Sequence, residues 1–173
     1  RQRGPGPKGS REAGGGLWPC GKVDPPIKSQ SLSQLPLHKR ATERGNLFMI
    51  FGIGTDLCAA GRMAEKLQKP AFVEHVFSPA EQALLNARGG THRAETAAAN
   101  FAAKEAFLKA AGTGLGGFAL ADLSVLRKES GAPYFVLTGP AADWAKTNAL
   151  TPYVSLTHEN GLACAFVVLE QNT

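Results

Sequence analysis

The sequence has little cysteine, and the three residues that it has are scattered: Cys20, Cys58 and Cys164. Their number is odd, and no two of them stand at the spacing of paired zinc ligands. A disulfide framework and a structural zinc site are therefore excluded as organising features. We interpret all three as free thiols, and we expect a cytoplasmic location.

Long apolar runs are missing too. No stretch approaches the roughly 20 apolar residues of a membrane helix, and there is no signal-peptide core, so no membrane partner is expected. Residues 1–48 carry a net charge of +6, whereas residues 49–173 carry −1. The pI near 9.3 belongs to the first segment. The rest of the chain lacks a basic footprint, and no nucleic-acid partner is expected.

Residues 1–48 also differ from the rest in composition. They are rich in glycine, proline, serine and basic residues and show no sustained apolar period. Such a segment buries too little to offset its ordering entropy, so we expect it to be disordered. A transit peptide is one interpretation, but the prolines oppose an amphipathic helix. We favour a non-native leader before a natural start at Met49, followed by one domain over residues 49–173.

Hydrophobic periodicity and turn residues predict short alternating elements in this domain. Helices are expected over residues 59–69, 78–88, 93–111 and 140–148. Strands are expected over residues 49–55, 123–127, 134–137, 153–157 and 162–169. Ser78 to Glu81 forms a capping box with proline at the first helical position, and Asn160-Gly161 is a hairpin turn signal. Because helices cluster early and strands late, the expected fold is α+β, with a mainly antiparallel sheet packed against one long central helix.

Two carboxylates stand in stretches that are otherwise patterned for burial. Asp56 follows the first predicted strand, and Glu105 lies inside the alanine-rich helix. A buried carboxylate is costly unless it is paired or binds a cation. Asp56 alone would suit the N-cap of the next helix, and Glu105 with Lys109 would suit an exposed i,i+4 pair. Taken together, the three residues indicate a hard metal ion and a phosphate.

Three motifs carry a family resemblance. They are Gly52–Asp56 (Gly-Ile-Gly-Thr-Asp), Phe101–Lys109 (Phe-Ala-Ala-Lys-Glu-Ala-Phe-Leu-Lys) and Val154–His158 (Val-Ser-Leu-Thr-His). In this order, within residues 49–170, they resemble the signature blocks of holo-acyl-carrier-protein synthases, which are small phosphopantetheinyl transferases. The resemblance implies the phosphopantetheinyl transferase-like fold. It also implies transfer of 4′-phosphopantetheine from coenzyme A to a serine of apo acyl carrier protein, with release of adenosine 3′,5′-bisphosphate.

The resemblance further implies roles for the motif residues. Asp56 and Glu105 would hold Mg²⁺, which commonly takes one or two protein carboxylates together with phosphates and water. Lys109 would contact a coenzyme phosphate, and His158 would lie beside the pyrophosphate. Glu105 is also the candidate base for the serine proton, so the expected catalytic set is Glu105, Lys109 and His158. The expected coenzyme contacts are Lys104, Lys109, Gly112, Thr113, Gly114 and His158.

The glycine run from Gly112 to Gly117 formally satisfies Gly-x-Gly-x-x-Gly. It follows a helix instead of linking a strand to a helix, so a dinucleotide-binding fold is not indicated. We expect these glycines to end the helix and to let the backbone approach the coenzyme.

One position departs from the family pattern. Arginine commonly precedes the Phe-Ala-Ala-Lys-Glu motif, and Asn100 stands there instead. A basic contact to the ribose phosphate of the coenzyme is therefore in doubt. His92, Arg93 and Lys104 are the candidates to replace it.

Arg62, Lys66 and Lys69 recur at i, i+4 and i+7 and form one basic stripe on the first predicted helix. A solvated charged face is the ordinary explanation. The family docks the acidic helix of acyl carrier protein on this helix, using an arginine that matches Arg62. Complementary charge would steer that encounter, and we expect the stripe to dock the carrier.

The family also forms homotrimers with active sites between subunits, and we expect the same assembly here. Two other functions remain open. One is a metal-dependent nucleotide phosphohydrolase that uses the same carboxylates. The other is a non-catalytic module that binds coenzyme A or a carrier protein.

Overall fold

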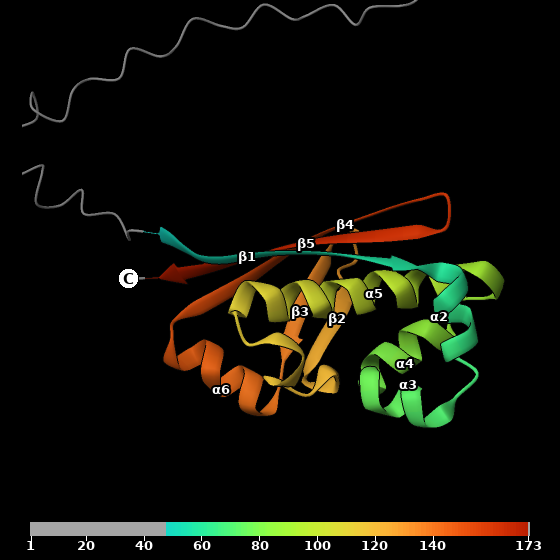
Figure 1. Ribbon diagram of the computed structural model, residues 1–173, viewed down its shortest axis with the longest axis horizontal. Helices are drawn as coiled ribbons and strands as arrows, with labels where there is room; N and C mark the ends of the chain where they lie inside the picture. The colour runs from blue at the N-terminus through green and yellow to red at the C-terminus, as the bar shows by residue number, and fades with distance from the viewer. Residues whose placement is uncertain (1–47, 173) are drawn as a thin grey trace, which may run out of the picture. The chain divides into compact units, whose positions relative to one another are not determined.

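The computed structural model describes residues 48–172, so the leader expected over residues 1–48 lies outside the described residues except for Phe48. The helices are α2 (Ala60–Lys66), α3 (Pro70–Val76), α4 (Pro79–Asn86), α5 (Gly90–Ala111) and α6 (Gly139–Thr147). The strands are β1 (Phe48–Ala59), β2 (Leu123–Arg127), β3 (Pro133–Leu137), β4 (Leu150–Glu159) and β5 (Leu162–Asn172). The predicted α+β fold with one long helix is confirmed (Figure 1). No helix in this stretch is both long and apolar enough to cross a membrane.

The main sheet is antiparallel and has the strand order β1-β5-β4, so β1 and β4 form its edges. β1 pairs with β5 along its length, from Phe48 opposite Asn172 to Ala59 opposite Leu162. The β4–β5 hairpin turns at Asn160-Gly161, where both φ angles are positive (50° and 75°), the geometry that Asn-Gly favours. β2 and β3 form a separate two-stranded antiparallel sheet. The predicted hairpin at Asn160-Gly161 is confirmed.

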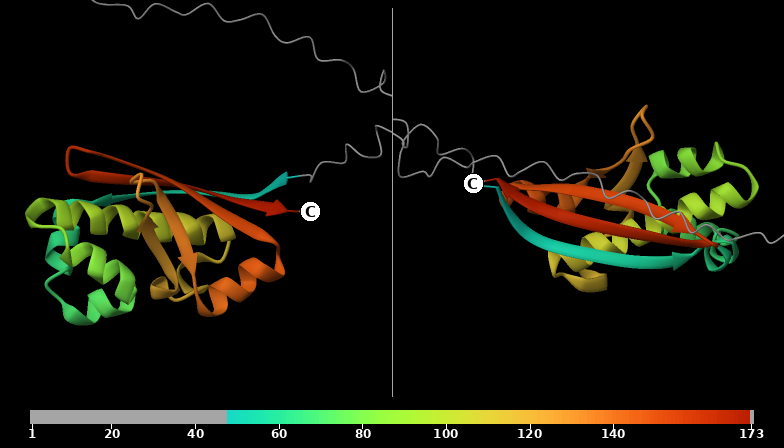
Figure 2. Two further views of the ribbon diagram at one scale, coloured as in Figure 1. Left: turned by 180° about the vertical axis from the view of Figure 1, so that it is seen from behind. Right: turned by 90° about the horizontal axis from the view of Figure 1, so that it is seen from above.

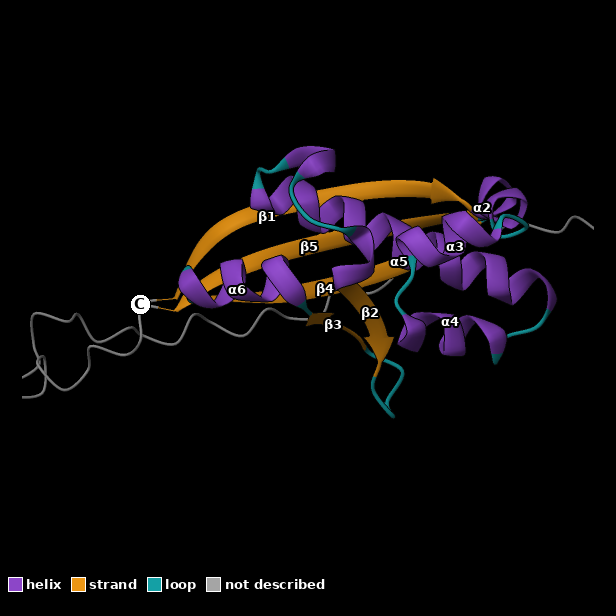
Figure 3. Cartoon of the chain, turned by 90° about the horizontal axis from the view of Figure 1, so that it is seen from below, coloured by secondary structure: helices purple, strands orange, loops and turns teal. Residues whose placement is uncertain are grey.

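Helix α5 lies across one face of the main sheet (Figure 3). The two elements approach closely because β1 presents glycines to the helix. A Cβ atom on Gly52 would lie 1.9 Å from the Ala110 carbonyl oxygen, and one on Gly54 would lie 1.9 Å from the Ala106 carbonyl oxygen. Asp56 lies two residues beyond Gly54 and points to the same side of β1. The glycines therefore bring this carboxylate close to α5.

No described helix covers the other face of the main sheet (Figure 2). We call it the outer sheet face, and it carries large apolar side chains that are each between 46% and 61% exposed: Ile53, Leu57, Tyr153, Leu162 and Phe166. An apolar surface spread over three strands is unusual for a face that meets only water.

The helix boundaries follow local chemistry in two places. Ser78 Oγ accepts a hydrogen bond from the Glu81 backbone N–H, and the Glu81 carboxylate accepts one from the Ser78 backbone N–H, as the capping box predicts. Helix α5 ends at Gly112, whose φ of 71° is the left-handed conformation expected of a terminating glycine.

Two predictions about the first elements are wrong. The helix expected over residues 59–69 ends at Lys66, and Pro70 begins a separate helix, α3, because a proline at the first helical position has no N–H to lose. β1 continues to Ala59 because β5 pairs with it that far, so Asp56 lies inside the strand and not in a turn. No side chain caps α2, which removes the N-cap explanation of Asp56.

Candidate active site

Asp56, Glu105 and Lys109 gather where β1 meets α5. Lys109 Nζ donates hydrogen bonds to Asp56 Oδ1 at 2.7 Å and to the Thr55 carbonyl oxygen at 2.9 Å. Glu105 lies one helical turn before Lys109. Burial raises the pKa of Glu105, and the negative charge of Asp56 raises it further, whereas Lys109 lowers it. The two carboxylates are thus near enough to repel each other.

This donor set suits Mg²⁺. Asp56 and Glu105 supply hard carboxylate oxygens, the ligands that this cation prefers. Among residues 48–172 no group of three or more His, Cys, Asp or Glu forms a metal site. Water and substrate phosphate oxygens would fill the remaining positions, as is common for Mg²⁺. A cation between the carboxylates would also relieve the repulsion that contributes to the raised pKa of Glu105.

The glycine loop continues from the same end of α5. Gly112 bonds through its backbone N–H to the Lys109 carbonyl oxygen at 3.1 Å. Gly112 and Gly114 have φ values of 71° and 64°, and Thr113 between them is exposed. Only glycine adopts such angles readily, so the loop presents an open backbone beside Lys109. Its contact with the coenzyme stays a prediction.

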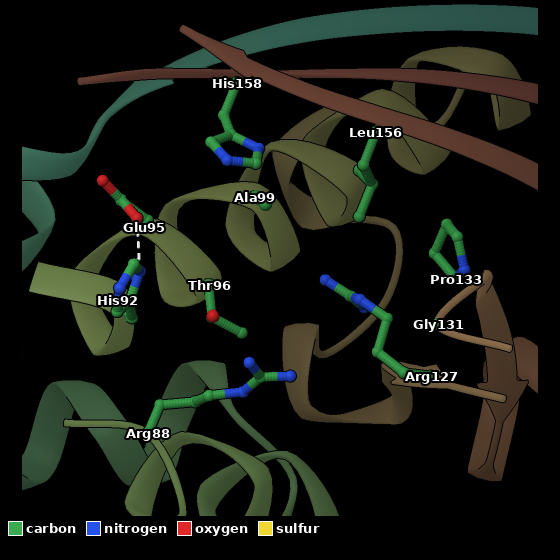
Figure 4. Close-up of a pocket in the computed structure, with 10 residues that line it drawn as sticks. All are labelled: Arg88, His92, Glu95, Thr96, Ala99, Arg127, Gly131, Pro133, Leu156 and His158. Atoms are coloured by element: carbon green, nitrogen blue, oxygen red, sulfur yellow. Dashed lines mark hydrogen bonds and ion pairs between the residues drawn. The ribbon is translucent and has the colours of Figure 1, made fainter. Parts of the chain in front are cut away.

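His158 lies at the opposite edge of the main sheet. It belongs to β4, whereas Asp56 belongs to β1, and β5 runs between them. His158 lines a hollow of about 350 Å³ together with Arg127 and with Ala99 of α5 (Figure 4). Ala99 precedes Glu105 by six residues, which places the two roughly 120° apart around the helix. Asp56 and Glu105 therefore lie at a different place on the chain from His158.

We call the group of Asp56, Glu105 and Lys109 the metal half-site. The hollow is the pocket half-site, and it is lined by Arg88, His92, Glu95, Thr96, Ala99, Arg127, Gly131, Pro133, Leu156 and His158.

Lys104 does not face a coenzyme, and its predicted contact is wrong. Its side chain is fully buried, and Nζ donates to Glu81 Oε2 at 2.6 Å, to the Val76 carbonyl oxygen at 2.7 Å and to the Leu120 carbonyl oxygen at 2.8 Å. These bonds use all three ammonium protons. Burial lowers the pKa of Lys104, and the Glu81 charge opposes that shift.

The other two candidates to replace an arginine at position 100, His92 and Arg93, line different hollows. His92 lines the pocket half-site, but its Nδ1 lies 3.1 Å from Glu95 Oε2. Arg93 lines a different hollow, beside Leu67 and Leu85. Of the three substitutes, only His92 reaches the pocket.

The sequence analysis missed Arg127, the basic residue that contacts Asn100. Its Nη2 donates to Asn100 Oδ1 at 3.0 Å. A signal was present, because side chains alternate along a strand. Arg127 shares a face of β2 with Leu123 and Val125, both of which are fully buried. An arginine on a core-facing position needs a partner or a ligand.

The expected basic stripe is shorter than predicted. Arg62 and Lys66 are exposed on α2, but Lys69 lies beyond the end of α2, at the N-cap of α3. Burial raises the pKa of the Cys58 thiol, the positive charge of Arg62 lowers it, and the negative charge of Asp56 raises it. Helix α2, which carries Arg62 and Lys66, directly follows β1, the strand that carries Asp56.

Comparisons with known proteins identify the family of the chain. The model of the 4′-phosphopantetheinyl transferase superfamily matches residues 52–167. A holo-[acyl-carrier-protein] synthase of Methylobacterium sp. (strain 4-46) is 45% identical over 132 residues, which cover 70% of this chain and 95% of the relative. A synthase of Clavibacter michiganensis is 41% identical over 124 residues, which cover 70% of this chain and 97% of the relative.

Solved structures give the same result. A holo-(acyl-carrier-protein) synthase from Bacillus anthracis, in complex with CoA (3′,5′-ADP), has a TM-score of 0.62 and 31% identity, covering 72% of this chain and 99% of that one. A synthase from Neisseria meningitidis has a TM-score of 0.62 and 32% identity, and the match covers 70% of this chain and 98% of that one. The chain therefore belongs to the 4′-phosphopantetheinyl transferase superfamily. The relatives that it matches over nearly their whole length are holo-[acyl-carrier-protein] synthases.

Proposed function

We propose that this chain transfers 4′-phosphopantetheine from coenzyme A to a serine of apo acyl carrier protein and releases adenosine 3′,5′-bisphosphate. The observation that carries the proposal is the metal half-site, where Asp56, Glu105 and Lys109 of two family motifs meet at the β1–α5 contact. The matched relatives act as their names state, and the chain covers nearly all of their length.

Asp56 and Glu105 would hold Mg²⁺ at this half-site. When bound, the cation offsets negative charge on the coenzyme diphosphate. Lys109 is the mobile cation of the site. Its side chain is 53% exposed and pairs with Asp56, so a phosphate oxygen of the donor could reach its ammonium group. A positive charge fixed beside the transferring group is the main contribution a protein makes to phosphoryl transfer.

Glu105 is the proposed base. The serine hydroxyl attacks the β-phosphorus of coenzyme A, its proton passes to Glu105 directly or through a water, and the phosphorus–oxygen bond to the adenosine bisphosphate breaks. This role is proposed from the place of Glu105 beside Asp56 and Lys109, where a bound carrier would present its serine. His158 would donate to a phosphate oxygen of the same donor.

The two half-sites support a site shared between copies. They lie at opposite edges of one sheet, so a second copy placed against the β1 edge could bring its own pocket half-site to the metal half-site. The outer sheet face supplies an apolar surface for such an assembly. A contact that joins the β1 edge of one copy to the β4 edge of the next is head-to-tail, and such contacts form a ring when the rotation between copies closes. We therefore propose a homotrimer with three equivalent sites.

The carrier protein would dock at Arg62 and Lys66. Both cations are exposed on α2, which directly follows the strand that carries Asp56, so an acidic surface held there would bring its serine toward the metal half-site. Opposite charges would speed the encounter and make it sensitive to salt. We also propose a cytoplasmic location, in keeping with the free thiols of Cys58 and Cys164.

The test is to incubate the protein with coenzyme A, Mg²⁺ and apo acyl carrier protein and then weigh the carrier by mass spectrometry. The expected result is one added phosphopantetheine group per carrier. Release of phosphopantetheine without carrier modification would instead identify a nucleotide phosphohydrolase. Coenzyme binding without turnover in either assay would identify a non-catalytic module.

A further inference from the structure

Asn100 is a fully buried amide whose orientation is fixed by three hydrogen bonds. Its Nδ2 donates to Glu81 Oε1 at 3.0 Å and to the Val125 carbonyl oxygen at 2.8 Å. Its Oδ1 accepts from Arg127 Nη2 at 3.0 Å. A flipped amide would set its NH₂ group against the Arg127 guanidinium, which is itself only a donor. Asn100 therefore presents an acceptor to Arg127.

The position of Asn100 is in turn set from inside the core. Glu81, which accepts from Asn100, also accepts from Lys104 Nζ at 2.6 Å and from the Val125 backbone N–H at 3.1 Å. Lys104, Glu81 and Asn100 are each 0% exposed, whereas Arg127 is partly exposed. A buried polar chain thus runs from α5 and α4 to a single guanidinium at the wall of the pocket half-site. Fully satisfied networks of this kind hold their members in one arrangement.

The Arg127 guanidinium faces the hollow with donors to spare. Nη1 donates to the Leu126 carbonyl oxygen at 3.2 Å and Nη2 donates to Asn100, which leaves other N–H groups of its five for a ligand. Figure 4 shows Arg127 and Arg88 reaching into the hollow from different elements. Burial lowers the pKa of Arg127, and the like charge of Arg88 lowers it further. Two guanidinium groups that repel each other across one hollow fit an anion between them.

Acidic residues do little to neutralise this hollow. Glu95 is the one carboxylate among its lining residues, and it lies 3.1 Å from His92. None of the ion pairs formed among residues 48–172 includes Arg88 or Arg127. The ligand that fits best is a phosphate monoester, which carries nearly two charges at neutral pH and accepts paired hydrogen bonds from guanidinium groups.

We propose that Asn100 is a positioning residue that holds Arg127 to bind the phosphate monoester of the coenzyme donor, opposite Arg88. The proposal rests on the proposed function, since coenzyme A carries one such monoester besides its diphosphate. An amide in the core and an arginine from β2 thus act as one unit at the pocket wall. Lys104, the residue next to Glu105 in sequence, supports this arrangement from inside the core through its ion pair with Glu81.

The test compares two donors, coenzyme A and 3′-dephospho-coenzyme A, in the carrier-modification assay. Arg127→Gln should raise the KM for coenzyme A about tenfold, which is about 1.4 kcal/mol, with kcat within about twofold of wild type. The KM for the dephosphorylated donor should stay within about twofold. Asn100→Ala should raise the KM for coenzyme A at least about threefold. It should leave the KM for the dephosphorylated donor within about twofold. Lys128→Gln, which removes an exposed neighbouring charge that does not line the hollow, should change neither.

Arg127→Lys separates positioning from charge and is useful if Asn100→Ala does not fold. If Asn100 aims a planar guanidinium, the lysine variant should resemble Arg127→Gln, because an ammonium cannot reproduce the fixed fork. A wild-type KM for the lysine variant would overturn the positioning role. Equal effects of Arg127→Gln on both donors would overturn the phosphate assignment.

The proposed function can fail separately from this inference. If the wild-type protein modifies no carrier with either donor, the function is wrong, and the pocket is then tested by calorimetry. Wild-type protein should still bind adenosine 3′,5′-bisphosphate more tightly than adenosine 5′-monophosphate, and Arg127→Gln should remove most of that difference. Equal affinity of the wild-type protein for both nucleotides would overturn the inference.

Discussion

Replacement of Lys104 by methionine measures what the buried ion pair contributes to the fold. Methionine fills a similar volume but leaves the Glu81 carboxylate buried without its cation. Three donors would remain to Glu81: the Ser78 backbone N–H at 3.0 Å, the Val125 backbone N–H at 3.1 Å and Asn100 Nδ2 at 3.0 Å. The expected loss therefore lies at the lower end of the range for breaking a buried pair, about 3 kcal/mol in the free energy of unfolding. For a domain of this size, that corresponds to a fall in Tm of about 10 °C.

The assay is urea unfolding followed by circular dichroism, with the exposed Lys146→Met of α6 as the control. The control should change the free energy of unfolding by no more than about 0.5 kcal/mol. The double variant Lys104→Met/Glu81→Gln removes both charges and should recover at least about 1.5 kcal/mol relative to the sum of the single variants. A loss below about 1 kcal/mol for Lys104→Met, or simple additivity in the cycle, would refute the reasoning.

Three further predictions follow from the site and the contacts that build it. Gly54→Ala should destabilise the protein by at least about 2 kcal/mol in urea unfolding, because the new Cβ would lie 1.9 Å from the Ala106 carbonyl oxygen; near-wild-type stability would contradict the close packing. In metal-free protein, Asp56→Asn removes the like charge that helps to raise the pKa of Glu105, so Glu105 should titrate at lower pH by NMR, and an unchanged or higher pKa would show that the carboxylates do not interact. Arg62→Glu should raise the KM for apo carrier about tenfold at low salt and leave the KM for coenzyme A within about twofold; the opposite ranking would remove the docking role.

Features fixed by short stretches of sequence were predicted well. The capping box at Ser78, the terminating Gly112 and the Asn160-Gly161 turn each depend on a few adjacent residues. Features that depend on residues distant in sequence were not predicted well. Where β1 ends depends on its pairing with β5, and whether Pro70 ends one helix or begins another depends on how the following residues pack.

The same distinction applies to the site. The motifs named Asp56, Glu105 and Lys109, and the fold brings these residues together. The motifs did not distinguish Lys104 from Glu105, which are adjacent in sequence but point about 100° apart around α5. Lys104 points into the core, whereas Glu105 points toward β1. Arg127 lay outside every motif, because its role depends on a contact with Asn100 across 27 positions of sequence.

The most direct test of the account is complementation between two inactive variants. Glu105→Ala removes the metal half-site, and His158→Ala removes part of the pocket half-site. If each active site combines half-sites from two copies, unfolding and refolding the variants together in equal amounts should restore about one quarter of the wild-type rate of carrier modification. A site is intact only when its metal half comes from the His158→Ala variant and its pocket half from the Glu105→Ala variant. This is one of four equally frequent pairings, which gives one quarter. No recovery in mixed assemblies, with each variant alone inactive and correctly folded, would contradict the shared site.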